Sequence, residues 1–119
     1  MQDVSMSRAA NTMANPREFE AAILLEAALQ LQDVQNHWDN AKQEIGAVLS
    51  HNRAFWNLFL SSICDSAHPL PGEIRQTIAN LALFVNHQTH AIAADPRPEP
   101  LTALIGINRE LAAGLLGRA

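Results

Sequence analysis

The sequence is poor in cysteine and contains no long apolar run. The one cysteine, Cys64, has no partner for an internal disulfide. It stands among apolar neighbours, and we expect its thiol to be a small buried hydrophobic group. No apolar stretch approaches the ~20 residues that cross a bilayer, and no basic-then-apolar leader opens the sequence. These absences predict a protein of the cytoplasm with no contact to membranes.

Basic residues are scarce as well. The 119 residues include 8 Lys and Arg against 12 Asp and Glu, which gives a formal net charge of -4. Lys42 is the only lysine, and the arginines are scattered. Proteins that hold nucleic acids by their phosphates need clustered Lys and Arg. The composition therefore argues against direct binding to nucleic acids.

What is present is an apolar content of 48% with a periodic arrangement. Apolar residues recur at steps of three and four in several segments, and no segment alternates with a period of two. Residues 1–14 show neither period. We therefore predict an all-α protein, an irregular bundle of four to five helices with a flexible N-terminal arm over residues 1–14 and a single domain over residues 15–119.

The expected helix boundaries follow from capping residues and prolines. Asn15 suits the N-cap and Pro16 the first helical position, and either Asp39 or Asn40 is expected to cap the second helix. Prolines exclude the segment 65–71 and the connector 95–100 from helix interiors. The predicted helices cover residues 15–36, about 40–63, 71–94 and 100–117.

No catalytic constellation is evident. Ser50 and His51 are sequence neighbours whose side chains diverge on a helix. His87 and His90 lie within about one helical turn, but zinc takes four ligands and no further soft-ligand pattern accompanies them. We expect no enzymatic activity, no cofactor and no metal site, and a small metal-dependent enzyme using His87 and His90 is the competing hypothesis.

The aromatic residues are expected to be mostly structural. Trp56, Phe59 and Phe84 fall on apolar helical stripes and are predicted to lie in the core. Trp38 is assigned to a loop, with His37 and Asp39 beside it. Base stacking would require a basic groove as well, which the sequence does not provide.

Five short motifs, taken in order, resemble a known family. They are HNRAFW at 51–56, LPGEIR at 70–75, FV-x-H at 84–87, IN at 107–108 and GL at 114–115. This order resembles the FlaF family, small flagellar biosynthesis regulators of alphaproteobacteria, with the pattern N-R-x-x-W, L-P-x-x-[LI]-R, an aromatic helix with histidine, and a final I-N before G-L. The proline-initiated first helix is also similar.

The resemblance implies a role in flagellin production. Such proteins are understood to promote flagellin synthesis or export and to act opposite the regulator FlbT, which restrains flagellin mRNA. Flagellin is therefore the expected partner, and FlbT a functional one. We predict a flagellin-binding adaptor or export chaperone, because flagellin's terminal segments form amphipathic helices that need an apolar groove before assembly. The alternative is a post-transcriptional regulator of flagellin mRNA that acts with or against FlbT.

The resemblance also supplies candidate partner-binding residues. Of these, Trp56 and Phe84, like Ile74 and Leu104, also fit a purely structural role in the core. Asn108 has a second interpretation too, as a polar residue that fixes helix register by hydrogen bonding across the core. The candidate residues are Asn52, Arg53, Trp56, Leu70, Pro71, Arg75, Phe84, His87 and Asn108.

Overall fold

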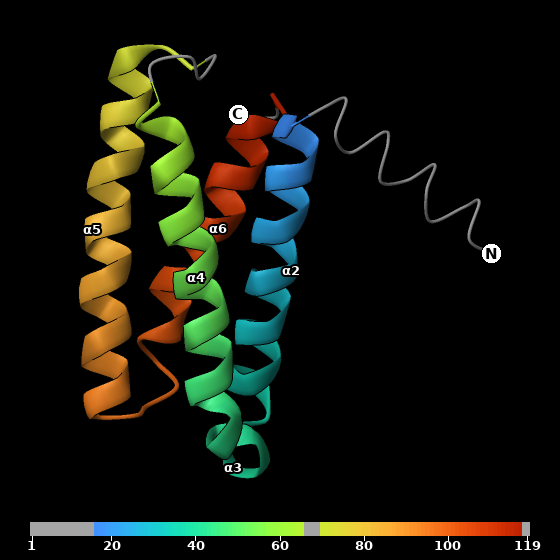
Figure 1. Cartoon of the computed structure of the whole chain (residues 1–119). Coiled ribbons are helices and arrows are strands. Elements are labelled where there is room, and N and C mark those ends of the chain that lie inside the picture. Colours follow the sequence, from blue (N-terminus) through green and yellow to red (C-terminus); the bar gives the residue numbers. More distant parts are fainter. Residues whose placement is uncertain (1–15, 66–69, 118–119) are drawn as a thin grey trace, which may run out of the picture.

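The computed structural model describes residues 16–65 and 70–117, and these residues form helices and short turns without a strand. The all-α prediction is confirmed, and the arm predicted over residues 1–14 lies outside the described residues, as does Asn15. The elements are α2 (Pro16–Asn36), α3 (Trp38–Ala41), the 3-10 helix η1 (Lys42–Glu44), α4 (Ile45–Ile63), α5 (Gly72–Ala94) and α6 (Leu101–Leu115) (Figure 1).

The four long helices form an irregular bundle (Figure 1). The antiparallel helices α2 and α6, far apart in the sequence, share the most extensive interface. Helix α4 packs against α2 on one side and against α5 on the other, whereas α5 meets α6 at few points. Helix α2 therefore pairs closely with both α6 and α4, whereas α5 and α6 are only loosely joined.

The core is built from the periodic apolar positions of all four long helices. Trp56 and Phe59 of α4 are buried as predicted, and their rings meet edge to face with centroids 6.1 Å apart. Burial of such side chains is the main favourable term in folding, at about 1.5–3 kcal/mol each. Phe84 of α5 is 43% exposed, so its assignment to the core was wrong.

The turn between α2 and α4 differs from the prediction. Trp38 opens the short helix α3 instead of lying in a loop, and it packs half-buried against the core. Neither Asp39 nor Asn40 caps α4, which begins only at Ile45 and has no side-chain cap. Backbone bonds explain this, because the amides of Asn40 and Ala41 already donate to the carbonyl oxygen of His37 at 2.9 and 2.8 Å. The chain thus turns through α3 and η1 without needing a polar cap.

Cys64 is exposed, and the expectation of a buried thiol was wrong. It follows Ile63, which is buried at the end of α4, and takes the C-cap position. One residue along a helix is a rotation of about 100°. This rotation carries Cys64 off the face that Trp56, Phe59 and Ile63 turn toward the core.

Helices α5 and α6 occur close to their predicted bounds. Pro71 is the N-cap of α5, one residue before its first helical position. Helix α6 starts after Pro100 and ends at Leu115, two residues earlier than expected. Gly117 explains the earlier end, since its φ of 74° is a left-handed conformation that glycine adopts freely at helix ends. Among the described residues, no helix is both long and apolar enough to cross a membrane.

Candidate binding groove

An apolar groove runs between α5 and α6. It consists of two adjoining hollows of about 290 and 260 Å³, which share Ile74, Ile78 and Leu111. We call it the α5–α6 groove. Its lining residues are Thr77, Leu81, Ile107 and Glu110 in the first hollow, Arg17, Leu70, Pro71, Gly114 and Leu115 in the second, and the three shared residues.

The groove is open because α5 packs mainly on α4. The buried face of α5 is centred on Ile78 and Val85. The adjacent stripe faces the gap, and there Ile74 is 47% exposed while Leu81 is half-buried. Among the residues described in α5 and α6, no hydrogen bond or ion pair joins the two helices. Contiguous apolar surface of this kind marks sites of interaction with other molecules.

The second hollow forms the end of the groove that lies near the start of α2. Arg17 stands at this end together with Leu70 and Pro71, the residues that lead into α5. Gly114 of α6 forms part of the wall, and a Cβ atom added there would meet no atom within 4 Å. A side chain can therefore start from position 114 without a clash at its Cβ, on the wall of the groove.

Two charged side chains flank the apolar lining. Arg17 is at the α2 end, and Glu110 projects from α6 beside the first hollow. Glu20 is close enough to Arg17 for their charges to interact. Burial raises the pKa of Glu20 above its ordinary value of 4.5, and the positive charge of Arg17 partly opposes that rise. The groove thus offers apolar contacts along its length and one charge of each sign at its rim.

Three of the predicted partner-binding residues lie inside the bundle and meet there. The indole Nε1 of Trp56 donates to Oδ1 of Asn108 at 3.0 Å, and Nδ2 of Asn108 donates to Oδ1 of Asn52 at 2.7 Å. All three side chains are buried, Asn52 and Asn108 with 0% exposure. The interpretation of Asn108 as a residue that hydrogen-bonds across the core is confirmed. We call these three residues the Asn108 cluster.

The other predicted residues are dispersed. Leu70 and Pro71 line the groove, and Phe84 lies exposed on α5 beyond Leu81. Arg75 turns toward α4 instead and donates to backbone carbonyl oxygens there. Arg53 and His87 are exposed but do not line the groove. The structure therefore does not gather the predicted residues into one site.

Sequence reasoning missed most residues that line the groove as site residues. The helical period alone predicts burial for Ile74, Leu81, Ile107 and Leu111, because all four fall on the apolar stripes of their helices. A carboxylate on a helix, such as Glu110, is ordinarily solvated and therefore does not mark a site. The available signal was the width of the apolar arc on α5, where Ile74, Leu81 and Phe84 extend it beyond what one neighbouring helix covers. Periodicity marks such an arc as apolar but does not say which part stays open.

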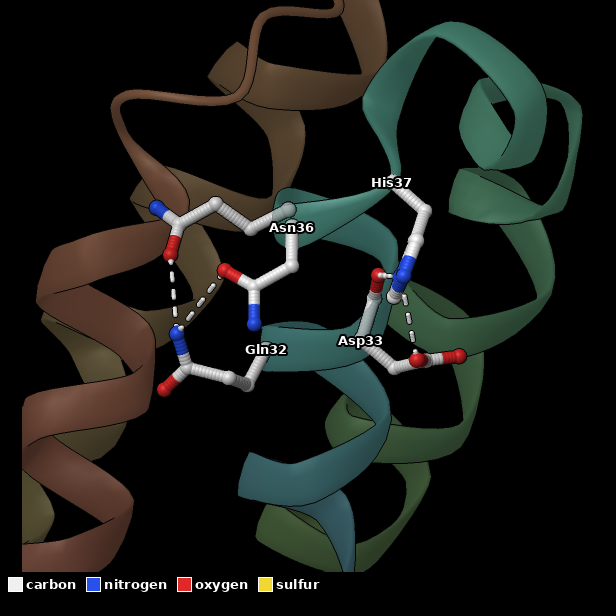
Figure 2. A network of polar contacts seen from close by, with 5 residues as sticks. Gln32, Asp33, Asn36 and His37 are labelled. Carbon is white, nitrogen blue, oxygen red and sulfur yellow. Dashed lines mark hydrogen bonds and ion pairs between the residues drawn. The ribbon is translucent and has the colours of Figure 1, made fainter.

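A polar surface forms at the far end of α2 (Figure 2). Nδ1 of His37 lies 3.0 Å from the carbonyl oxygen of Asp33 and 3.3 Å from its Oδ1, while Nε2 of Gln32 lies 3.4 Å from Oδ1 of Asn36. Figure 2 shows the two pairs on different sides of the helix. Exposed contacts of this kind contribute at most about 1 kcal/mol. They complete the end of α2 and do not build a binding site.

Metal-ligating side chains are not gathered in the described parts of the chain. There, no group of three or more His, Cys, Asp or Glu residues is arranged to hold a metal ion. His87 and His90 are both exposed on α5. The groove between α5 and α6 is consequently the feature with the clearest capacity for binding, and that capacity is for apolar groups.

Comparison with protein families identifies the family of the chain. A family model described as flagellar protein FlaF matches residues 4–115. The chain belongs to the FlaF family. No significant match to a curated protein or to a solved structure was found. This FlaF protein keeps its N-R-x-x-W and I-N motif residues Asn52, Trp56 and Asn108 in the buried cluster, whereas the L-P motif residues Leu70 and Pro71 line the groove.

Proposed function

We propose that this FlaF protein is a non-enzymatic, flagellin-binding adaptor or export chaperone of the cytoplasm. Its α5–α6 groove would receive an amphipathic helical segment of flagellin before filament assembly. The observation that carries the proposal is the open apolar seam, with Ile74 and Phe84 exposed at 47% and 43% on a single helix. Family membership supplies the flagellar context.

The dimensions of the groove suit one helix. From Ile74 to Phe84 the exposed stripe of α5 extends for about 15 Å, since a helix rises 1.5 Å per residue. That length matches roughly three turns of a bound helix, whose apolar side chains at i, i+3, i+4 and i+7 would enter the groove. Helix-in-groove binding of this kind gives affinity through apolar burial rather than through charge.

The lining offers little to RNA. Arg17 is the only basic residue among the lining residues that the structure describes, and Glu110 opposes it in sign. Binding to phosphates requires several basic side chains along a track. An effect on flagellin mRNA is therefore better explained through a protein partner such as FlbT than through direct contact.

Calorimetric titration of the purified protein with monomeric flagellin tests the proposal. We expect saturable binding with a Kd of about 10 μM or tighter. A Gly114→Leu variant, which fills the groove, is expected to weaken binding at least tenfold. The matched control is Gly106→Leu, because Gly106 is on the same helix, an added Cβ there also meets no atom within 4 Å, and Gly106 does not line the groove.

Both substitutions replace a helical glycine, so both should raise helix propensity by a similar amount. A loss of affinity confined to Gly114→Leu would assign flagellin to the groove. If the wild-type protein shows no binding at tens of micromolar with both proteins folded, direct recognition of flagellin is wrong. Equal weakening by both variants would place the binding surface elsewhere.

A further inference from the structure

We propose that Asn108 is the positioning residue of the α5–α6 groove. Through the Asn108 cluster it holds α6 as the fixed wall, and α5 is the wall that adjusts to an occupant. This inference rests on the proposed function for the identity of the occupant, but not for the mechanical division between the two walls.

The first argument is the way in which Asn108 joins three helices at one point. Its Oδ1 accepts from the indole of Trp56, and its Nδ2 donates to Oδ1 of Asn52 at 2.7 Å and to the carbonyl oxygen of Leu24 at 3.4 Å. Helix α6 is thereby bonded to α4 through side chains and to α2 through the backbone. Hydrogen bonds are directional, so this contact fixes both the rotation and the register of α6, which apolar packing specifies less strictly.

The second argument is the position of Asn108 relative to the groove. Ile107 is its direct neighbour and Leu111 follows three residues later, and both line the groove. A slip of α6 by one residue corresponds to a rotation of about 100°. Such a slip would turn Ile107 and Leu111 away from α5. The bonds of Asn108 therefore determine which α6 side chains the groove presents.

The third argument is that α5 is attached differently. The polar contacts of Arg75 fasten α5 to the end of α4, at 3.3 Å from the carbonyl oxygen of Ile63. Along the described residues of α5 and α6, by contrast, no hydrogen bond crosses the groove. The Oδ1 of Asn86 on α5 is buried without a hydrogen-bond partner. Helix α5 is thus anchored by polar contacts at one end, and it carries a buried polar atom that no hydrogen bond holds in place.

The Asn108 cluster also gives the residues of two FlaF motifs a shared structural role. Asn52 and Trp56 belong to one FlaF motif and Asn108 to another, and the structure brings them together in the core with Trp56 only 1% exposed. None of them is accessible to a partner. Their contribution to binding must therefore pass through the position of α6.

The test uses Asn108→Leu, which keeps similar volume and removes all three bonds. Spin labels on the full chain, in a Cys64→Ser background, report two distances. Glu26→Cys with Glu110→Cys measures α2 to α6, and Leu83→Cys with Glu110→Cys measures α5 to α6. In the otherwise unchanged protein we expect a narrow α2–α6 distribution and a broader α5–α6 distribution.

Asn108→Leu is expected to broaden or shift the α2–α6 distribution. An unchanged α2–α6 distribution in that variant overturns the proposal, as does an α5–α6 distribution as narrow as that of α2–α6 before substitution. Should Asn108→Leu fail to fold, Trp56→Phe removes the indole donor and part of the buried ring but leaves the other two bonds of Asn108 in place, and it is expected to give a smaller change in the same direction. These distances need no flagellin, so they judge the positioning role even if flagellin does not bind.

The affinity for flagellin provides a second, separate readout. Asn108→Leu is expected to weaken binding at least tenfold at a temperature where circular dichroism shows the protein fully folded. Leu31→Ala, which removes a buried side chain of α2 outside the cluster, is the control for lost stability and is expected to bind like the wild type. Equal losses in the two variants, or binding by Asn108→Leu within twofold of wild type, would overturn the positioning role in binding.

Discussion

Arg75 of α5 binds the carboxyl end of α4, where its Nη1 lies 3.3 Å from the carbonyl oxygen of Ile63 and 3.2 Å from that of Asp65. The last carbonyl groups of a helix have no partner within it and carry partial negative charge. A guanidinium group at this place satisfies them and favours the helix dipole. One side chain therefore links the two helices that are joined through residues 66–69.

Replacement of Arg75 should lower stability. We expect Arg75→Leu to reduce the free energy of unfolding by about 1–2 kcal/mol, since it leaves carbonyl groups unpaired and removes a favourable charge. Urea unfolding followed by circular dichroism measures the change. Arg53→Leu, at an exposed position of α4, is the control and should change stability by less than about 0.5 kcal/mol. Equal effects of the two substitutions would contradict a specific role for Arg75.

Two phenylalanines should separate stability from binding. Phe59 is buried, so Phe59→Ala is expected to cost about 3–5 kcal/mol of unfolding free energy. Phe84→Ala should cost roughly 1 kcal/mol or less, because the ring is already 43% exposed. If Phe84 extends the groove as proposed, the same variant should weaken flagellin binding. A large stability loss in Phe84→Ala would mean that α5 packs more closely than described.

Glu20 should make stability depend on pH. Burial raises its pKa in the folded protein above the ordinary value of 4.5, so the folded state favours the protonated carboxyl. As pH rises above 4.5, the unfolded chain loses this proton first, and the contribution of Glu20 to folding falls. As pH rises from 4.5 to the pKa of Glu20 in the folded protein, the unfolding free energy of the wild type should therefore fall relative to that of Glu20→Gln. A difference that is constant with pH would contradict the raised pKa.

Cys64 should react without unfolding. Because its thiol is exposed at the end of α4, we expect the native protein to be modified by a thiol reagent at a rate within about tenfold of the urea-unfolded protein at equal pH. Absorbance of the released thiolate follows the reaction. If modification occurs only above the unfolding transition, the thiol is buried and the position of the α4 end needs revision.

Most helix bounds could be predicted from the sequence, but which residues the neighbouring helices bury could not always be predicted. The start of α2 at Pro16 and the end of α5 at Ala94 agree with the prolines near these positions and with an apolar period that the local sequence carries. Phe84 and Cys64 were misassigned because periodicity identifies an apolar arc, while burial depends on which helix covers it. Which helix covers an apolar arc depends on the tertiary packing, and here α5 packs mainly against α4.

In the candidate site, too, the local sequence signals were predicted but the contacts between helices were not. Asn108 was recognised as a polar residue on an apolar face, and a hydrogen bond across the core was one of two interpretations. Its partners Asn52 and Trp56 stand more than fifty residues earlier, and no local rule connects them. An apolar groove was expected only because of the expected flagellin partner, and its location was not predicted, because its walls come from helices whose contact the sequence does not specify.

The pairing of α2 with α6 has a consequence for how the chain acquires its structure. The most extensive interface joins residues 16–36 to residues 101–115, so its formation must await synthesis of the last helix. While the polypeptide emerges from the ribosome, α2 would display its apolar stripe without the surface that later covers it. Contacts between distant segments slow folding relative to local ones. Newly made chains should thus depend on chaperones until α6 is released, and truncation before residue 101 should leave the remaining helices prone to aggregation.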